Sequence, residues 1–438
     1  MIRDLIKRTQ NPVIRNTMWI LSSNIFQMAA SLIIGLLTAR YLGPSNYGVL
    51  SYVGSIVAIF VPLSSVGLQG VVINSLVKEP NNEGVILGSS FLLQFISSIL
   101  SMFLLLLLIV LLNPRFEFVI IISLLQGLSL MFRSFEIIDY WFQSQLKSKQ
   151  SAIAKIFTTL IISMYRLYII YFGKNIIWFG ITVLLECLLY GLVVLFLYIR
   201  KKGPKLKIQI NRMVSLFSQS YHFILSGVMV LVYTQIDKIM LGNYFNETLV
   251  GVYSASVHIT EMWIFFPTAL IVSMRPIIIK YKNSNLQHKY LSSLFSLYSF
   301  VFWSSIFVSI FVSVFSNYIV NLLYGSQYVS GETSLKFLIW ANAVAMLGNA
   351  RGVWILAENK NRFVKIYLGW GLLTNILLNS ILIPRYGMEG AAFATLITQI
   401  VSVYIAPLFY SETRIHTVLL MKSMNPNHLI DAIRGNNG

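Results

Sequence analysis

The chain has 438 residues, of which 56% are hydrophobic and only 11% are charged. Soluble proteins carry about 25% charged residues, so this composition and the mean hydropathy of +0.73 exclude an ordinary soluble enzyme. The formal net charge of +18 suits a membrane protein whose basic residues gather in cytoplasmic loops. The single cysteine, Cys187, excludes a disulfide framework and a cysteine-based metal site.

Long apolar stretches follow one another along the whole chain. Cutting the sequence where charge, Pro, Gly and Asn cluster gives about twelve helices, each near the ~20 residues that a bilayer requires. The first half contains Thr17–Thr38, Tyr47–Gln69, Val85–Leu112, Phe116–Phe135, Ser151–Phe172 and Asn175–Ile199. The second half contains Ser215–Leu241, Leu249–Met274, Leu291–Phe315, Thr333–Val353, Val364–Ile383 and Met388–Tyr410. The sequence therefore predicts an all-α polytopic membrane protein.

The basic residues predict the orientation of these helices. With the N-terminus inside, about 26 Lys and Arg residues fall on inner segments and about five on outer ones. We therefore expect both termini to be cytoplasmic. The first apolar run, of about 22 residues, is too long for a cleavable signal peptide. Because no soluble domain is available to carry a basic face, we expect no nucleic-acid partner.

The chain divides into two halves of six helices. The basic segment Arg200–Arg212 is the marked break in composition, and it predicts one lobe over residues 1–203 and a second over residues 204–438. A weak echo supports a parallel repeat, since Leu42-Gly43 before Tyr47-Gly48-Val49 resembles Leu241-Gly242 before Val250-Gly251-Val252.

The loops carry none of three common catalytic sequence patterns. There is no phosphate-binding Gly-rich loop followed by Lys-Ser/Thr, no His-Glu-x-x-His pair and no G-x-S-x-G elbow. The largest outer loop, around Ser316–Glu332, has about 17 residues, too few for a glycan polymerase or ligase. We expect a protein that is not an enzyme and that binds neither a metal nor a cofactor.

Polar residues inside the membrane are candidate functional residues, because each charge there costs about 2.5–3.5 kcal/mol to insert. Arg40 ends the first helix, and Tyr233 precedes Asp237 by four residues in the seventh. The other candidates are Asn24, Gln27, Arg166, Glu186, Lys238, Glu261, Asn375 and Asn379. Packing contacts between helices, solvated helix ends and side chains that reach the interface remain alternatives.

Three segments resemble bacterial polysaccharide flippases of the O-antigen (Wzx) type. Ala39-Arg40-Tyr41-Leu42-Gly43-Pro44 is similar to the end of their first helix, and Asp237-Lys238-Ile239-Met240-Leu241-Gly242 to the end of their seventh. Asn375, Asn379, Pro384, Tyr386-Gly387 and Gly390-Ala391-Ala392 resemble their last two helices. The similarity extends over about residues 15–410.

The resemblance implies the multidrug/oligosaccharidyl-lipid/polysaccharide exporter superfamily, with two six-helix lobes around a central cavity. The implied substrate is an O-antigen or capsule repeat unit on undecaprenyl pyrophosphate, moved from the cytoplasmic to the outer leaflet of the bacterial inner membrane by alternating access. Partners would be membrane lipids, a polysaccharide polymerase and chain-length proteins. Rival interpretations are a multidrug or cation antiporter of the same superfamily and, less favoured, a membrane glycan polymerase.

We expect these candidate residues to have different roles in transport. In this hypothesis Arg40, Arg166 and Lys238 hold the pyrophosphate. Asn24, Gln27 and Asn379 contact sugar hydroxyls, and Tyr233 offers a stacking surface. Energy would come from the membrane potential, or from proton or sodium coupling through Glu186, Asp237 or Glu261.

Overall fold

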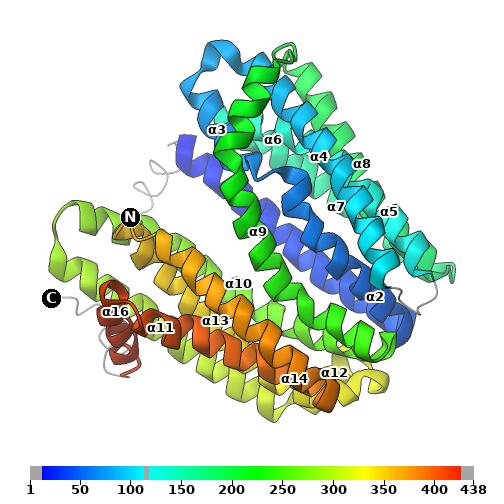
Figure 1. The fold of residues 1–438 in the computed structure, drawn as a ribbon, viewed down its shortest axis with the longest axis vertical. Helices are drawn as coiled ribbons and strands as arrows, with labels where there is room; N and C mark the ends of the chain where they lie inside the picture. The colour runs from blue at the N-terminus through cyan, green and yellow to red at the C-terminus, as the bar shows by residue number, and fades with distance from the viewer. Residues whose placement is uncertain (1–11, 113–117, 426–438) are drawn as a thin grey trace, which may run out of the picture. The chain divides into compact units, whose positions relative to one another are not determined.

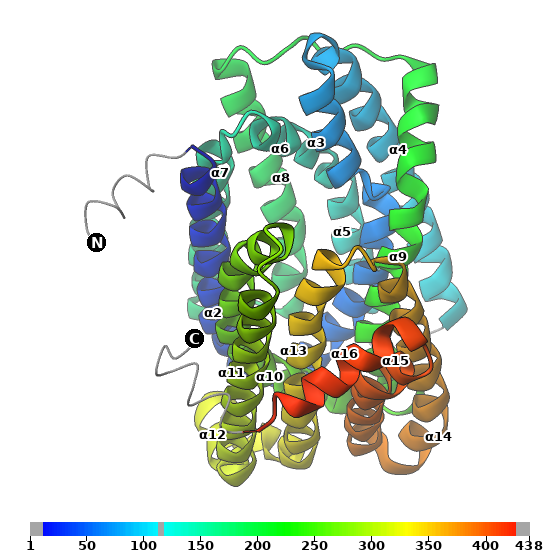
Figure 2. The ribbon, with the colours of Figure 1, turned by 90° about the vertical axis from the view of Figure 1, so that its left-hand side faces the viewer.

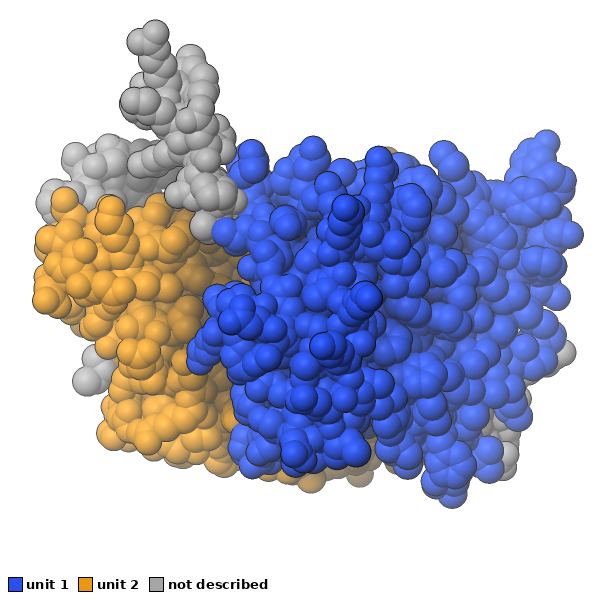
Figure 3. Space-filling model, turned by 90° about the horizontal axis from the view of Figure 1, so that it is seen from above, with its two compact units in different colours: residues 1–231 blue, residues 232–438 orange. Residues whose placement is uncertain are grey.

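The chain folds into helices that form two compact units. The structure is a computed structural model that describes residues 12–112 and 118–425, and within these ranges it contains no strand. One unit comprises residues 1–231 and the other residues 232–438 (Figure 3). This confirms the all-α class. The units divide inside a helix that follows the basic segment, and the lobe boundary expected at residues 203/204 stays a prediction.

The described residues of the first unit form seven α-helices and the beginning of an eighth, which continues into the second unit (Figure 1). They are α2 (Pro12–Ser65), α3 (Leu68–Lys78), α4 (Glu83–Leu112), α5 (Val119–Phe132), α6 (Glu136–Ser144), α7 (Ser148–Tyr171), α8 (Ile176–Arg200) and α9 (Ile210–Tyr244). Two short 3₁₀ turns, η1 (Pro80–Asn82) and η2 (Arg133–Phe135), lie between them. α2 packs on α4, α5 and α7, while α8 packs on α5 and α7.

The second unit is arranged around one central helix, α13. Its elements are α10 (Glu247–Asn283), α11 (Gln287–Val314), α12 (Ser316–Tyr324), η3 (Ser326–Gly331), α13 (Glu332–Ala357), α14 (Arg362–Ile400), η4 (Val401–Ile405), α15 (Ala406–Leu408) and α16 (Ser411–Lys422). α13 packs against α10, α11 and α14, and Figure 2 shows α16 beside α15. The segment expected as a long outer loop at Ser316–Glu332 is instead helical, formed by α12 and η3.

Within the described part of the chain, nine helices are long and apolar enough to cross a membrane. This establishes a multi-pass membrane protein, and the count of about twelve stays a prediction. Two of the nine each cover two of the expected spans. α2 contains a break at Gly43 (φ 69°) and α14 one at Gly387 (φ 57°). Both lie where the sequence separates one span from the next, and glycine adopts positive φ without a Cβ clash.

The fourth expected span ends later than its sequence suggests. We expected it to end at Phe135, between the charged residues Arg133 and Glu136, but the helical segment continues through η2 and α6 to Ser144. α6 buries Ile137, Trp141 and Phe142 against α3 and α8. This apolar face holds the segment in the unit, and it therefore carries the charged residues at its start into the interior.

Candidate functional site

A cavity of about 250 Å³ lies within the first unit, at a break in a membrane-spanning segment. The segment Val119–Ser144 is interrupted near its middle by the 3₁₀ turn η2, which starts at Arg133. A 3₁₀ turn inside a longer helical segment often marks a functional hinge. Irregular backbone at membrane depth is tolerated where protein buries it or where it lines a hydrated cavity.

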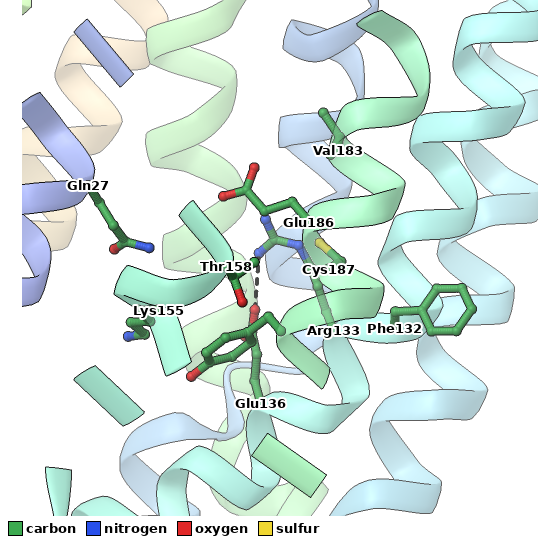
Figure 4. Close-up of a pocket in the computed structure, with 10 residues that line it drawn as sticks. Gln27, Phe132, Arg133, Glu136, Lys155, Thr158, Val183, Glu186 and Cys187 are labelled. Carbon is green, nitrogen blue, oxygen red and sulfur yellow. Dashed lines mark ion pairs between the residues drawn. The ribbon is translucent and has the colours of Figure 1, made fainter. Parts of the chain in front are cut away.

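The cavity is lined by charged and polar side chains from four parts of the unit (Figure 4). α2, the α5–η2–α6 segment, α7 and α8 contribute to its wall, and the lining residues are Gln27, Phe132, Arg133, Glu136, Lys155, Thr158, Val183, Glu186, Cys187 and Tyr190. In Figure 4 the side chain of Arg133 reaches between those of Glu136 and Glu186. Because such groups are expensive inside a bilayer, they make this cavity the candidate functional site of the first unit.

Two loose ion pairs hold the charges of this site. Arg133 Nη1 lies 3.6 Å from Glu136 Oε1, and each side chain is 31% exposed. Lys155 Nζ lies 3.6 Å from Asp139 Oδ2, whose side chain is buried. At these distances the pairs make no direct hydrogen bond, so the guanidinium and the ammonium keep donors available to a molecule entering the cavity.

The backbone at the break is supported from a neighbouring helix. The buried side chain of Gln94 in α4 donates from Nε2 to the main-chain carbonyl of Arg133, 3.1 Å away. The same carbonyl also accepts from the main-chain N–H of Glu136 within the 3₁₀ turn, so Gln94 is its second donor. Gln94 therefore ties the turn from which Arg133 reaches the cavity to α4.

Two of the residues singled out from the sequence, Gln27 and Glu186, line this cavity together. Asn24 lies on α2 close to Gln27 but is exposed. Arg40 is exposed near the end of the first part of α2, before Gly43. Arg166 is half-buried on α7 and donates from Nη2 to Thr182 Oγ1 at 3.2 Å. Arg40 and Arg166 are not among the residues that line the cavity.

In the second unit, Asp237 of α9 lies at the centre of a buried hydrogen-bond cluster. Its Oδ1 accepts from Asn379 Nδ2 at 2.6 Å and from Asn375 Nδ2 at 3.3 Å. Its Oδ2 accepts from Tyr253 Oη at 2.7 Å and from Thr395 Oγ1 at 2.6 Å. These donors come from α10 and from both sides of the Gly387 break in α14. The break thus brings Thr395 to the same carboxylate as the two asparagines.

One acceptor of this cluster is unsatisfied. Asn379 Oδ1 is buried and has no hydrogen-bond partner among the described residues. Thr395 Oγ1 also lies 3.0 Å from the main-chain oxygen of Ala391, an alternative acceptor for its single proton. A carboxylate beside an unpaired amide oxygen and a hydroxyl is a set of hard oxygen atoms, which suits a small hard cation.

The other candidates of the second unit lie around this cluster. Tyr233 is half-buried one helical turn before Asp237. Lys238 is half-buried and donates from Nζ to Gln235 Oε1 at 3.3 Å. Glu261 is exposed on α10. The roles expected for the candidates of both units stay predictions.

Four charged residues of the first unit were not predicted as site residues. Arg133 and Lys155 belong to the basic residues expected on the inner side, and Glu136 and Asp139 lie beyond the expected end of the fourth span. The spacing Arg133-x-x-Glu136-x-x-Asp139 was the available signal, because oppositely charged residues three apart share one helix face.

The chain has relatives among proteins of polysaccharide biosynthesis. Residues 13–282 match the family described as polysaccharide biosynthesis protein. The probable flippase AglR of Haloferax volcanii is 25% identical over 198 residues, which cover 42% of this chain and only 39% of AglR. The capsular polysaccharide biosynthesis protein CapF of Staphylococcus aureus is 22% identical over 415 residues, which cover 91% of this chain and 100% of CapF.

Solved membrane transporters share the fold. The inward-facing conformation of a multidrug resistance MATE family transporter of the MOP superfamily matches with a TM-score of 0.69 and 12% identity, over 90% of this chain and 96% of the transporter. The lipid II flippase MurJ, in an inward closed conformation, matches with a TM-score of 0.68 and 20% identity, over 95% of this chain and 92% of MurJ. These likenesses confirm the transporter fold that the three sequence segments implied.

Proposed function

Because the chain belongs to the polysaccharide biosynthesis protein family, we propose that it is a flippase for a lipid-linked oligosaccharide. Its substrate is an O-antigen or capsule repeat unit on undecaprenyl pyrophosphate, moved from the cytoplasmic to the outer leaflet by alternating access. The observation that carries this proposal is the charged cavity around Arg133, in the middle of a membrane-spanning segment.

The charged cavity lowers the energetic cost of moving a polar substrate through the membrane. A sugar and a pyrophosphate cannot cross hydrocarbon unaided, because their hydrogen bonds and charges would be left unsatisfied. A cavity that offers cationic donors and polar side chains replaces part of their hydration. The capsule protein CapF, which matches this chain over its full length, supports a substrate of this kind.

In this proposal Arg133 and Lys155 contact the phosphate groups. Glu136 and Asp139 neutralise them while the cavity is empty, and their loose 3.6 Å pairing lets phosphate oxygens take their place. A guanidinium can bind two phosphate oxygens at once. Gln27 is placed to bind sugar hydroxyls. The proposed sugar contacts still include Asn24 and Tyr233. The proposed path of the pyrophosphate still includes Arg40, Arg166 and Lys238.

We assign the coupling role first to the cluster around Asp237. A sodium ion would find the carboxylate, the unpaired Oδ1 of Asn379 and the Thr395 hydroxyl in one place, and a proton would bind the carboxylate itself. Asn379 then belongs to the ion site rather than to the sugar site. Glu186 and Glu261 are the remaining candidates. The membrane potential is the other source, worth about 2.3 kcal/mol per charge per 100 mV.

The proposal places the protein in the bacterial cytoplasmic membrane with both termini inside. The ends of the chain lie outside the described residues, so this orientation depends on the distribution of basic residues. The lipid-linked oligosaccharide and the membrane lipids are the immediate partners. The polymerase and chain-length proteins would act on the exported repeat unit.

The leaflet location of the substrate tests the proposed function. Proteoliposomes containing the full chain and a polyprenyl-pyrophosphate oligosaccharide with a fluorescent label are treated with a membrane-impermeant quencher. We expect the protected fraction to fall with time, and to stay constant for Arg133→Ala. A wild-type protein that leaves the protected fraction unchanged, while it lowers the accumulation of cationic drugs in cells, would contradict the proposal.

That second outcome corresponds to a multidrug or cation antiporter. The carboxylates Glu136 and Glu186, beside the aromatic rings of Phe132 and Tyr190, are the observation that favours it, because a lipophilic cation binds such a surface. Glu186→Gln then lowers drug export more than oligosaccharide export, whereas a flippase is more sensitive to Arg133→Ala.

A further inference from the structure

The segment that joins α8 to α9 is bound to the beginning of α4 as an extended strap, Gly203–Gln209. Lys207 N donates to Gly84 O at 2.9 Å, and Gln209 N donates to Ser89 Oγ at 3.0 Å. The Ser89 hydroxyl also donates to Gln209 O at 3.3 Å. The backbone of this segment is therefore fixed at the surface of the first unit.

Two glycines of α4 allow this close contact. A Cβ at Gly84 would lie 2.2 Å from Lys205 O, and a Cβ at Gly88 would lie 2.4 Å from Lys207 O. Neither distance is compatible with a real side chain, so the strap lies directly on the helix backbone. Any larger residue at these two positions would force it away.

The side chains of the strap point outward in alternation. Lys205 and Lys207 are exposed, and between and beyond them Leu206 and Ile208 are 45% and 59% exposed. Ile210, at the start of α9, is 74% exposed. In an extended backbone successive side chains lie on opposite sides, so the strap presents a basic edge and an apolar edge together.

Five of the six basic residues of this region have no ion-pair partner among the described residues. The segment Arg200–Arg212 contains six basic residues and no acidic one. Arg212 pairs with Glu79 at 2.9 Å. In the described part of the chain, no ion pair involves Arg200, Lys201, Lys202, Lys205 or Lys207.

The strap also lies at the level of the membrane surface. It follows Arg200, the end of one membrane-spanning helix, and precedes Ile210, the start of the next. Exposed apolar side chains at this level enter the boundary between headgroups and acyl chains, while lysines extend to the phosphates. The basic excess places this surface on the cytoplasmic side.

We propose that the strap is a preformed binding site for anionic phospholipid headgroups of the cytoplasmic leaflet. Lys205 and Lys207 bind the phosphates, and Leu206 and Ile208 lie among the upper parts of the acyl chains. The contacts of the strap with Gly84, Gly88 and Ser89 hold its backbone in place. Lipid binding therefore carries no further entropic cost of ordering the strap. This inference does not depend on the transported substrate.

Native mass spectrometry of the full chain in detergent, titrated with phosphatidylglycerol or phosphatidylcholine, tests the charge requirement. Each lysine near an anionic surface contributes about fivefold to affinity. For Lys205→Gln/Lys207→Gln we expect phosphatidylglycerol binding to weaken at least tenfold, with phosphatidylcholine binding unchanged. The control is Lys280→Gln/Lys289→Gln, two exposed lysines of the second unit. Equal weakening in both double variants, or in neither, would overturn the proposal.

The requirement for a fixed strap backbone is tested with variants that keep every lysine. Gly88→Ala forces the strap away from α4, and Ser89→Ala removes its two hydrogen bonds to Gln209. We expect each to weaken phosphatidylglycerol binding about fivefold or more. Full affinity in both would contradict a preformed site, since the lysines would then act as a flexible tail. The milder Ser89→Ala keeps the test valid if Gly88→Ala fails to fold.

A competition experiment distinguishes a phospholipid from the polyprenyl carrier as the anionic lipid that binds the strap. Undecaprenyl phosphate also carries an anionic headgroup on an apolar chain, and it is added as a competitor. We expect it to displace phosphatidylglycerol only at comparable concentration. Displacement at a tenfold lower concentration would overturn the phospholipid assignment and identify the strap as an entry site for the polyprenyl carrier.

Discussion

The side-chain amide of Gln94 donates to the main-chain carbonyl of Arg133 across 3.1 Å, from one helix of the first unit to a break in another. One polar contact thus stabilises the turn that presents a cation to the cavity. Within the 3₁₀ turn the same carbonyl also accepts from the main-chain N–H of Glu136. Gln94 supplies its second hydrogen bond and connects the break to α4.

Gln94→Leu should destabilise the protein by about 1 kcal/mol, because the Arg133 carbonyl loses one of its two donors and keeps the Glu136 N–H. The melting temperature in detergent measures the effect, and we expect it to fall together with flippase activity. Gln219→Leu is the control, since Gln219 is exposed and bonds only within its own helix. Equal melting temperatures for the two variants would show that Gln94 does not support the break.

The sequence predicted the two breaks in the long helices better than this one. Gly43 and Gly387 lie where apolar periodicity stops, and glycine is the residue that such a backbone requires. At Arg133 the sequence pattern predicted the end of the span too early, because charges after an apolar run normally mark the end of a span. What keeps them inside is the packing of Trp141 and Phe142 against α3 and α8, together with the hydrogen bond from Gln94 in α4. These contacting helices are distant from Arg133 in the sequence.

The candidate site was predictable in a similarly partial way. The cost of placing polar groups inside a membrane identified Gln27 in one unit, and Asp237 and Asn379 in the other, as candidate residues. Their partners could not be derived. Thr395 contacts Asp237 only because the Gly387 break changes the course of α14, and spacing along the sequence does not contain that information.

A double-mutant cycle at Arg133 and Glu136 separates charge balance from substrate binding. Arg133→Ala should destabilise the protein by about 1–3 kcal/mol, because Glu136 loses its counter-ion in a partly buried site. Adding Glu136→Gln removes that unpaired charge, so we expect the double variant to regain most of the stability but none of the transport. Thermal unfolding and the proteoliposome assay give the two readouts, with Arg275→Ala, at an exposed arginine, as control. Transport restored together with stability would mean that Arg133 has a structural role alone.

Asp237→Asn tests the coupling site in the second unit. The substitution keeps the shape of the side chain but replaces an oxygen that accepts hydrogen bonds with an amide that donates them. We expect the response of transport to imposed sodium or proton gradients to disappear, and the rate to fall at least about tenfold. Glu389→Gln, at an exposed acid of the same unit, should respond normally. A normal gradient response in Asp237→Asn would contradict this assignment and leave the membrane potential or another carboxylate as the energy source.

His416 should make the second unit sensitive to mild acid. Its imidazole is buried, stacks on Trp354 at 4.0 Å and lies 2.7 Å from Tyr298 Oη, and this burial lowers its pKa to about 3, with a smaller contribution from Arg351. The unfolded chain binds a proton near pH 6.5, whereas the folded one does not until much lower pH. Protons therefore favour unfolding between these values, and lowering the pH from 6.5 to 5 should cost about 2 kcal/mol. Melting curves at pH 7.5 and 5 measure this loss, which His416→Gln should reduce and His288→Gln, at an exposed histidine, should not. An equal fall in all three proteins would show that the α16 histidine does not set the acid sensitivity.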